Sequence, residues 1–277
     1  MGKFYSLVFV LCCGVFLGRA QSIHFDRLDI NDGLSQNTVT SIIQDDKGFM
    51  WFGTKDGLCR YDGKSFKTFM HDPRLTTGLG NSLIKCLVQD HDHRIWVGTD
   101  SGLYIYDPET ENFSGVPLYA ADGKPITKPI SILDCDREGR VWIVVENSDV
   151  FCYDPQTRGV ECRYKPRKPL RSLASDKNGV IWFAGYGGGL YCTEDLFQNV
   201  KPFLDADGQE IYPKDIISFI CLSDYNEMYL GLEEHGVAKV DLVAGTVTRL
   251  RLSDNPDAPL FVRHILPYSP DELWIGT

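Results

Sequence analysis

The 277-residue sequence has no apolar run as long as a membrane helix needs. Its longest, mostly apolar stretch is residues 4–17, shorter than the roughly 20 residues that span a bilayer. One lysine precedes the stretch, and small residues follow it before Gln21. This pattern predicts a secretory signal peptide over residues 1–20. An uncleaved anchor and lipoprotein processing at Cys12 or Cys13 stay open as alternatives.

Basic clusters are also scarce, since no run of Lys or Arg exceeds two residues and the formal net charge is −10. A surface that binds nucleic acid needs clustered Lys and Arg, so we expect no direct contact with nucleic acid. The sequence contains no C-x-x-C pair and no His or Cys spacing typical of a metal site. We therefore expect no metal and no cofactor.

The cysteines offer no even disulfide framework. Nine are present, and seven remain after the predicted cleavage. Most of them stand among apolar residues, where Cys behaves as a small hydrophobic side chain. We expect mostly free, buried thiols, although some could pair in an oxidising compartment. The seven are Cys59, Cys86, Cys135, Cys152, Cys162, Cys192 and Cys221.

A recognisable set of nucleophile, base and orienting group is missing as well. The six histidines follow no regular spacing, so the sequence predicts no ring of imidazoles around a channel. We predict that this chain is not itself an enzyme. The histidines are His24, His71, His91, His93, His235 and His264.

The sequence does contain a repeat, one stretch that recurs several times with variations. Residues 38–69 read as four short strands, because apolar and polar positions alternate in short β-rich segments. Between the first two strands, residues 45–48 form a predicted hairpin turn in which Asp45 caps the backbone and Gly48 takes the left-handed conformation. In a second copy His93 replaces that glycine, and histidine still reaches positive φ.

The period of the repeat identifies the architecture. The marker aromatics are spaced 40 to 47 residues apart, and a propeller blade is about 40 to 50 residues long. We therefore predict an all-β protein, an incomplete β-propeller over residues 21–277. The predicted blades lie near residues 38–69, 82–113, 130–164, 170–204 and 216–250, with the start of the next at 262–277. The marker aromatics are Trp51, Trp96, Trp142, Trp182, Tyr229 and Trp274.

Residues 23–30 resemble an outermost strand that arrives without its inner partners. Propellers commonly close by letting an N-terminal strand complete the last blade, which removes exposed sheet edges. Five full blades and part of a sixth cannot close a ring. A seven-bladed ring at about 45 residues per blade needs roughly 315 residues, so on the order of 60 are absent. The sequence thus predicts a fragment of a longer protein.

The motif resembles the two-component regulator propeller repeats of hybrid two-component histidine kinases in gut Bacteroidetes. The resemblance covers nearly all of residues 23–277 and rests on NDGLSQNTVTSIIQDDKGFMWFGTKDGLCRYDGKSF and the later IWVGTDSGLYIYD. It is most specific in the first two blades. Later blades depart from it, with Val144-Val145 in place of Gly-Thr, Ala184-Gly185 in the fourth blade, and Tyr229 in place of Trp.

The resemblance implies a periplasmic ligand-sensing propeller, the N-terminal part of a sensor kinase anchored in the inner membrane. Such sensors detect oligosaccharides released from glycans and regulate the genes for their use. The implied partners are an oligosaccharide and the missing blades and second propeller of the parent chain, and a homodimer mate stays open. A fold does not fix a function. Two alternatives therefore stay open: a secreted propeller enzyme, either a lyase or glycan-active, and a truncated product without function.

Several features are candidates for a binding site, and each has a structural reading. The repeated Trp residues favour core packing between sheets over sugar stacking. Residues 90–93 (Asp-His-Asp-His) favour a turn over a metal site. The glycine-rich residues 185–189 favour a link between strands over a phosphate cradle, because no helix follows them. Their bare backbone could still contact a ligand.

Two kinds of loop point to an exposed rim. Residues 120–126 and 205–211 are long blade-to-blade connections, each with an Asp-Gly turn, and they are either extra length or a surface for a partner. The links between second and third strands should lie on the same rim. They supply our candidates for contact with a ligand or partner, which are Lys55, Asp100, Tyr186 and Glu234.

Overall fold

The computed structural model describes residues 25–277, except 148, 224–225, 253–260 and 270–271. The predicted signal peptide and the N-terminal cysteines lie outside the described residues. Within them, every regular element is a strand. A search of the same residues finds no helix with the length and apolar character to cross a membrane.

The strands form five four-stranded antiparallel sheets and one two-stranded sheet, which we call blades one to six. Blade one comprises β1 (Val39–Gln44), β2 (Met50–Thr54), β3 (Gly57–Tyr61) and β4 (Phe66–Phe69). Blade two comprises β5 (Ile84–Gln89), β6 (Ile95–Thr99), β7 (Gly102–Asp107) and β8 (Asn112–Val116). Blade three comprises β9 (Ile130–Cys135), β10 (Val141–Val145), β11 (Val150–Asp154) and β12 (Gly159–Tyr164).

Blade four comprises β13 (Leu170–Ser175), β14 (Ile181–Gly185), β15 (Leu190–Thr193) and β16 (Lys201–Pro202). Blade five comprises β17 (Ile217–Leu222), β18 (Glu227–Leu232), β19 (Gly236–Asp241) and β20 (Val247–Leu250). Blade six comprises β21 (His264–Ser269) and β22 (Glu272–Gly276).

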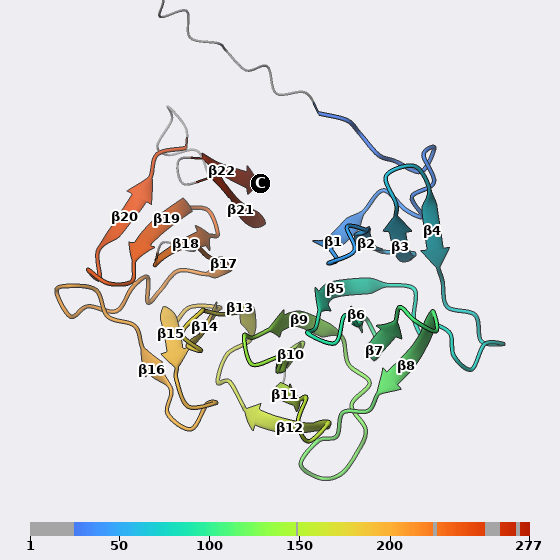
Figure 1. Ribbon diagram of the computed structural model, residues 1–277. Coiled ribbons are helices and arrows are strands. Elements are labelled where there is room, and N and C mark those ends of the chain that lie inside the picture. The colour runs from blue at the N-terminus through green and yellow to red at the C-terminus, as the bar shows by residue number, and fades with distance from the viewer. Residues whose placement is uncertain (1–24, 148, 224–225, 253–260, 270–271) are drawn as a thin grey trace, which may run out of the picture.

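The blades follow one another around a common centre. In each four-stranded blade the strands pair in chain order, and the first strand lies innermost (Figure 1). The ring is open between blades six and one. The predicted all-β propeller is therefore confirmed, as is its incomplete ring.

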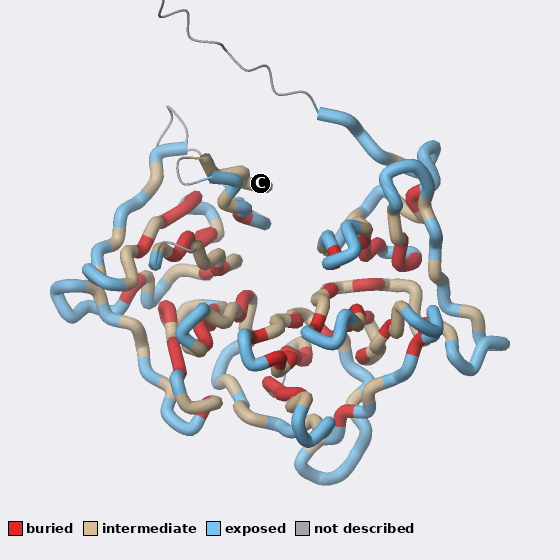
Figure 2. Tube along the Cα trace, viewed as in Figure 1, coloured by how far each residue is buried: buried red, intermediate tan, exposed pale blue. Residues whose placement is uncertain are grey.

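The core lies in the inner and middle strands of each blade. All residues of β6 and β10 are buried, whereas outer strands such as β4 and β12 alternate between half-buried and exposed (Figure 2). A sheet that packs on both faces needs apolar side chains on both, which explains the continuous runs IWVGT and VWIVV. The outer strands meet solvent and can carry charge.

Neighbouring blades interlock through one recurrent position on the first strand. Leu87 of blade two packs in a cluster with Trp51 of blade one. The equivalent side chains of blades three to six pack in the same way on the marker aromatic of the preceding blade: Leu133, Leu173, Ile220 and Ile265. Ile42 is the equivalent in blade one, and it is 54% exposed. On the open side of blade one, an apolar side chain is thus exposed at the position that packs on the preceding blade elsewhere in the ring.

The predicted outer strand at residues 23–30 is wrong over its described part, because residues 25–29 have no regular structure and a turn follows them. An outer strand pairs with the third strand of its blade, and the described part of blade six has two strands. The segment nonetheless reaches that blade. The ring of Phe25 meets the edge of the Trp274 indole, with ring centroids 5.3 Å apart.

Candidate functional site

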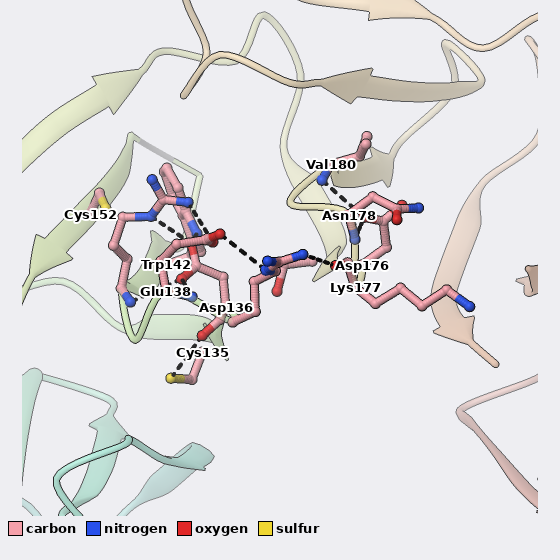
Figure 3. Close-up of polar contacts among 12 residues, drawn as sticks. Cys135, Asp136, Glu138, Trp142, Cys152, Asp176, Lys177, Asn178 and Val180 are labelled. Atoms are coloured by element: carbon pink, nitrogen blue, oxygen red, sulfur yellow. Dashed lines mark hydrogen bonds and ion pairs between the residues drawn. The ribbon is translucent and has the colours of Figure 1, made fainter. Parts of the chain in front are cut away.

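The marker tryptophans of blades one to four are held by a carboxylate in the turn before them. Each indole Nε1 donates to the Oδ2 atom of the Asp six residues earlier, and Figure 3 shows this for Asp136 and Trp142. The donor–acceptor distances for Trp51, Trp96, Trp142 and Trp182 are 2.8, 2.6, 2.9 and 3.0 Å. The four rings are at most 5% exposed. They are core residues, as predicted.

The same carboxylate shapes the turn. Asp45 Oδ1 accepts from the backbone N–H groups of Lys47 and Phe49, at 3.0 and 2.8 Å. The carboxylate of Asp45 therefore accepts three hydrogen bonds, two from backbone N–H groups of the turn and one from the Trp51 indole. This one side chain fixes both the turn and the indole. We call this arrangement the Asp–Trp clamp. Its recurrence explains why the repeat requires Asp at this position.

Residues 90–93 form the clamp turn of blade two, as predicted. Asp90 binds Trp96 and also accepts from Arg94 Nε at 2.8 Å, so its oxygens are occupied. His93 takes the positive φ of 63° that the turn requires. Across the described residues, no group of three or more His, Cys, Asp or Glu side chains is placed to hold a metal ion.

The seven cysteines of the described chain are free, as predicted, but only Cys59, Cys152 and Cys192 are buried, three are half-buried and Cys162 is exposed. Burial raises the pKa of the Cys135 and Cys152 thiols to about 12 and that of Cys221 to about 11. Burial also raises the pKa of Cys86 strongly. These four thiols stay protonated at neutral pH, and a protonated thiol is a poor nucleophile and metal ligand.

The links between second and third strands share one geometry. The residue four positions after the marker aromatic donates its backbone N–H to the carbonyl of a residue just before the first strand. Lys55 donates to Thr38 at 3.2 Å, Asp100 to Leu83 at 3.0 Å, and Tyr186 to Pro169 at 3.3 Å. Three of our candidates thus occupy equivalent positions of one rim, which we call the rim positions.

The fourth candidate is displaced by one residue. Glu233, and not Glu234, makes the equivalent bond in blade five, and Glu146 makes it in blade three. Sequence reasoning missed both, although counting four residues from each marker aromatic would have found them. In blades two and three the rim positions are linked, because Lys85 Nζ lies 3.6 Å from carboxylate oxygens of both Asp100 and Glu146. Contact with a ligand stays a prediction for all of these residues.

The two long connections contain the same kind of turn. Asp205 accepts from the N–H groups of Asp207 and Gln209, at 3.0 and 2.8 Å, as the clamp aspartates do but without an indole. Ala120 and Lys124 close the other turn through a 2.9 Å backbone bond. The turns were predicted correctly. A role in binding a partner stays a prediction.

Blade four carries a pocket of about 480 Å³ at its rim. One wall is the basic connection 165–169 from blade three. The glycine-rich link 185–189 also lines the pocket, together with Tyr164, Phe183 and Tyr191. Among the rim candidates, Tyr186 lines this pocket and is 42% exposed. The glycine-rich residues are a link between strands, as predicted.

The close approach of residues 165–169 and 185–189 depends on glycine. A Cβ atom on Gly185 would lie 2.1 Å from the carbonyl oxygen of Pro169, so only glycine allows the strand to pass there. Gly189 has a φ of +82°, and a Cβ atom there would lie 2.8 Å from the carbonyl oxygen of Ile211. The glycines therefore position the pocket wall, and they leave its backbone uncovered.

Comparison with known proteins identifies the repeat. The model of the family described as "Two component regulator propeller" matches residues 33–56 and 78–101, which belong to blades one and two. These segments are two-component regulator propeller repeats, as the sequence indicated. A 46-residue stretch, 17% of this chain, is 48% identical to "Histidine kinase P4" of Formosa agariphila and covers 3% of that protein.

Solved structures show the same fold. The extracellular domain of the putative hybrid two component system BT3049 from B. thetaiotaomicron matches 91% of this chain, with a TM-score of 0.63 and 22% identity. PorZ of Porphyromonas gingivalis, a surface component of the type-IX secretion system, matches 86% with a TM-score of 0.69 and 12% identity. The chain spans 40% and 37% of those two proteins.

Proposed function

We propose that this chain is the N-terminal sensing region of a hybrid two-component histidine kinase, because segments of blades one and two match the model of the two-component regulator propeller family. The family match carries the proposal. The 48% identity of a short stretch to a histidine kinase supports it, and so does the shared fold with the extracellular domain of a putative hybrid two component system. A propeller in that place binds a ligand and biases the conformation of the parent protein.

The proposed ligand is an oligosaccharide released from a glycan, and the proposed location is the periplasm, with the parent protein anchored in the inner membrane. The pocket of blade four, which Tyr186 lines, supplies a concave surface where a ligand can enter. The further blades and second propeller of the parent chain, and a second copy of it, are the proposed protein partners. Catalysis belongs to the parent protein's kinase and not to these repeats.

Gene induction tests this proposal in the native cell. Cells that carry the parent gene, and cells in which the segment encoding residues 38–250 is deleted in frame, are supplied with single purified oligosaccharides. We expect at least one oligosaccharide to induce glycan-utilisation genes in the first strain and none of these genes in the second. Equal induction in both strains would overturn the sensing role.

A further inference from the structure

The pocket of blade four is bordered by the most basic stretch of an acidic chain. Residues 163–171 contain five cationic side chains and no acid, whereas the whole chain has a formal net charge of −10. A local cluster of one sign concentrates ligands of the opposite sign. The five are Arg163, Lys165, Arg167, Lys168 and Arg171.

Three of these cations, Arg163, Lys165 and Lys168, already have a polar partner. Arg163 pairs with Glu161 at 2.9 Å, and Lys165 lies 3.8 Å from Asp149. Lys168 Nζ donates to the carbonyl oxygen of Gly187 at 3.0 Å and so joins the basic connection to the glycine-rich link. Arg167 is exposed and forms no ion pair with any residue in the described part of the chain. Its guanidinium is available to an incoming anion.

Arg167 belongs to the pocket by its electrostatic neighbourhood as well as by position. Burial raises the pKa of Tyr164, the hydroxyl of Tyr191 adds to this rise, and the positive charge of Arg167 opposes it. Arg167 and Tyr164 both line the pocket. A planar guanidinium can bind a carboxylate or a sulfate group through two parallel hydrogen bonds.

The remaining walls are aromatic. Phe183 stacks on Tyr191 with an interplanar angle of 16° and ring centroids 5.8 Å apart. Tyr186 projects from the glycine-rich link, and the Arg171 guanidinium carbon lies 5.2 Å from its ring centroid. Tyrosine offers a flat apolar face together with a hydroxyl group, which suits a ring that is apolar on one side and polar at its edge.

Blade three shows that this chemistry is particular to blade four. Lys128-Pro129 precedes β9 as Lys168-Pro169 precedes β13, and the rim residue donates its N–H to the proline carbonyl in both blades. In blade three that rim residue is Glu146, which lies near Lys85, and in blade four it is Tyr186. The backbone is the same, but the acid is replaced by an aromatic ring beside unpaired cationic charge.

We propose that the pocket of blade four binds an acidic oligosaccharide, with its carboxylate or sulfate group on Arg167 and Lys168 and a sugar ring against Tyr186. The biological role of this pocket rests on the proposed sensing function, but its ligand chemistry rests on the pocket alone. Neutral oligosaccharides lack the group that Arg167 would bind. The pocket therefore selects for charge.

Calorimetric titration of the 277-residue chain tests this. The ligands are trigalacturonate for the carboxylate, a κ-carrageenan tetrasaccharide for the sulfate, maltotriose as the neutral control, and sodium sulfate as the free ion. We expect at least one acidic oligosaccharide to bind, and we expect sodium sulfate and maltotriose to bind at least tenfold more weakly. Raising the salt from 50 to 300 mM should weaken binding of the acidic ligand, because salt screens exposed charges.

Two variants localise the binding. Arg167→Gln should weaken the acidic ligand at least tenfold, about 1.4 kcal/mol. Lys128→Gln removes a cation from the corresponding connection of blade three and should leave binding unchanged. Circular dichroism checks that both variants fold. Equal loss in both variants, no loss in Arg167→Gln, or tighter binding of maltotriose would overturn the assignment. Failure of every acidic ligand would also overturn it, while gene induction by a neutral oligosaccharide would leave the sensing role standing.

Discussion

Blades one to four and blade five all bury a large ring at the marker position, but the ring has different hydrogen-bond partners. The first four use the Asp–Trp clamp, whereas blade five has Ser223 and Tyr229 at the two positions. Tyr229 is still only 5% exposed, and its hydroxyl donates to Glu227 at 3.0 Å. Ser223 still closes the turn through a 2.9 Å backbone bond to Glu227. The blade thus requires a large buried ring at this position, and the carboxylate–indole bond is an addition to it.

A pocket lies where blades four and five meet. A pocket of about 730 Å³ is lined by residues of blades four and five, including Trp182, Leu222, Ser223 and Val243. Val243 is 80% exposed. The pocket is therefore lined jointly by the clamp of blade four, Asp176 and Trp182, and by residues of blade five.

Loss of a clamp ring should have the largest effect. Trp96→Ala removes a fully buried side chain that packs with Leu133 of the next blade. A large-to-small change of this kind costs about 3–5 kcal/mol, which should be measured by urea denaturation. Trp96→Phe keeps a ring and is the control. A Trp96→Ala variant with unchanged stability would show that the ring does not form part of the core.

Loss of a clamp carboxylate should have the next largest effect. Asp45→Ala leaves the buried Trp51 indole N–H and two turn amides without their acceptor, which we expect to cost about 2–3 kcal/mol. Asp205→Ala removes the same two amide contacts from an exposed turn that holds no indole, and it should cost less than about 1 kcal/mol. If both variants lost equal stability, the indole bond would contribute nothing.

Loss of the Tyr229 hydroxyl contact in blade five should destabilise the chain less than loss of a clamp carboxylate. Tyr229→Phe keeps the buried ring and removes only the hydroxyl bond to Glu227, so we expect a loss of about 0.5–1.5 kcal/mol in urea denaturation. Glu227 keeps its contact with Lys239 at 2.6 Å, which limits the loss. A cost as large as that of Asp45→Ala would show that blade five depends on its polar contact as much as blade one does.

The smallest effect concerns pH and the contact between blades three and four. Asp134 Oδ2 accepts from the backbone N–H and the hydroxyl of Ser175, and burial raises the pKa of Asp134 from 3.8 to about 6. The folded chain thus holds this proton to higher pH than the unfolded chain. The contribution to stability is full below pH 3.8 and is lost as pH rises through 6.

Thermal melts between pH 4 and 7 check this behaviour. Asp134→Asn cannot titrate, and its amide oxygen can still accept from Ser175. We expect a flatter dependence of melting temperature on pH than in the unchanged chain, with the two curves diverging between pH 4 and 6. Parallel curves for the two proteins would mean that Asp134 titrates normally in the fold.

The sequence predicted the features that repeat. The spacing of the aromatics predicted the blades, and the Asp turns and buried Trp rings followed from their place in each copy. The rim positions were partly found, because Lys55, Asp100 and Tyr186 are equivalent while Glu234 is displaced by one residue. The blade-to-blade contact of the first strand needed the structure, since Leu87 and Ile42 look alike in sequence and differ only in whether a blade precedes them.

The features that do not repeat were harder to predict. The segment at residues 23–30 resembled a strand, but strand formation depends on a partner edge that the sequence of the segment does not specify. The pocket of blade four brings a basic connection together with rings that lie up to 27 residues further on, Tyr164 to Tyr191. Strand pairing within blade four and the packing of blade three on blade four create this proximity, so no local motif could predict it.

The central claim is that the repeated clamp residues build the ring and that the pocket of blade four binds the ligand. Hydrogen exchange followed by mass spectrometry, with and without the acidic oligosaccharide that binds, tests both parts at once. We predict slower exchange on binding in peptides that cover residues 164–171 and 185–191, and unchanged exchange in the clamp turns at residues 45–51 and 90–96. Protection of the clamp turns with no change at the pocket would contradict the account.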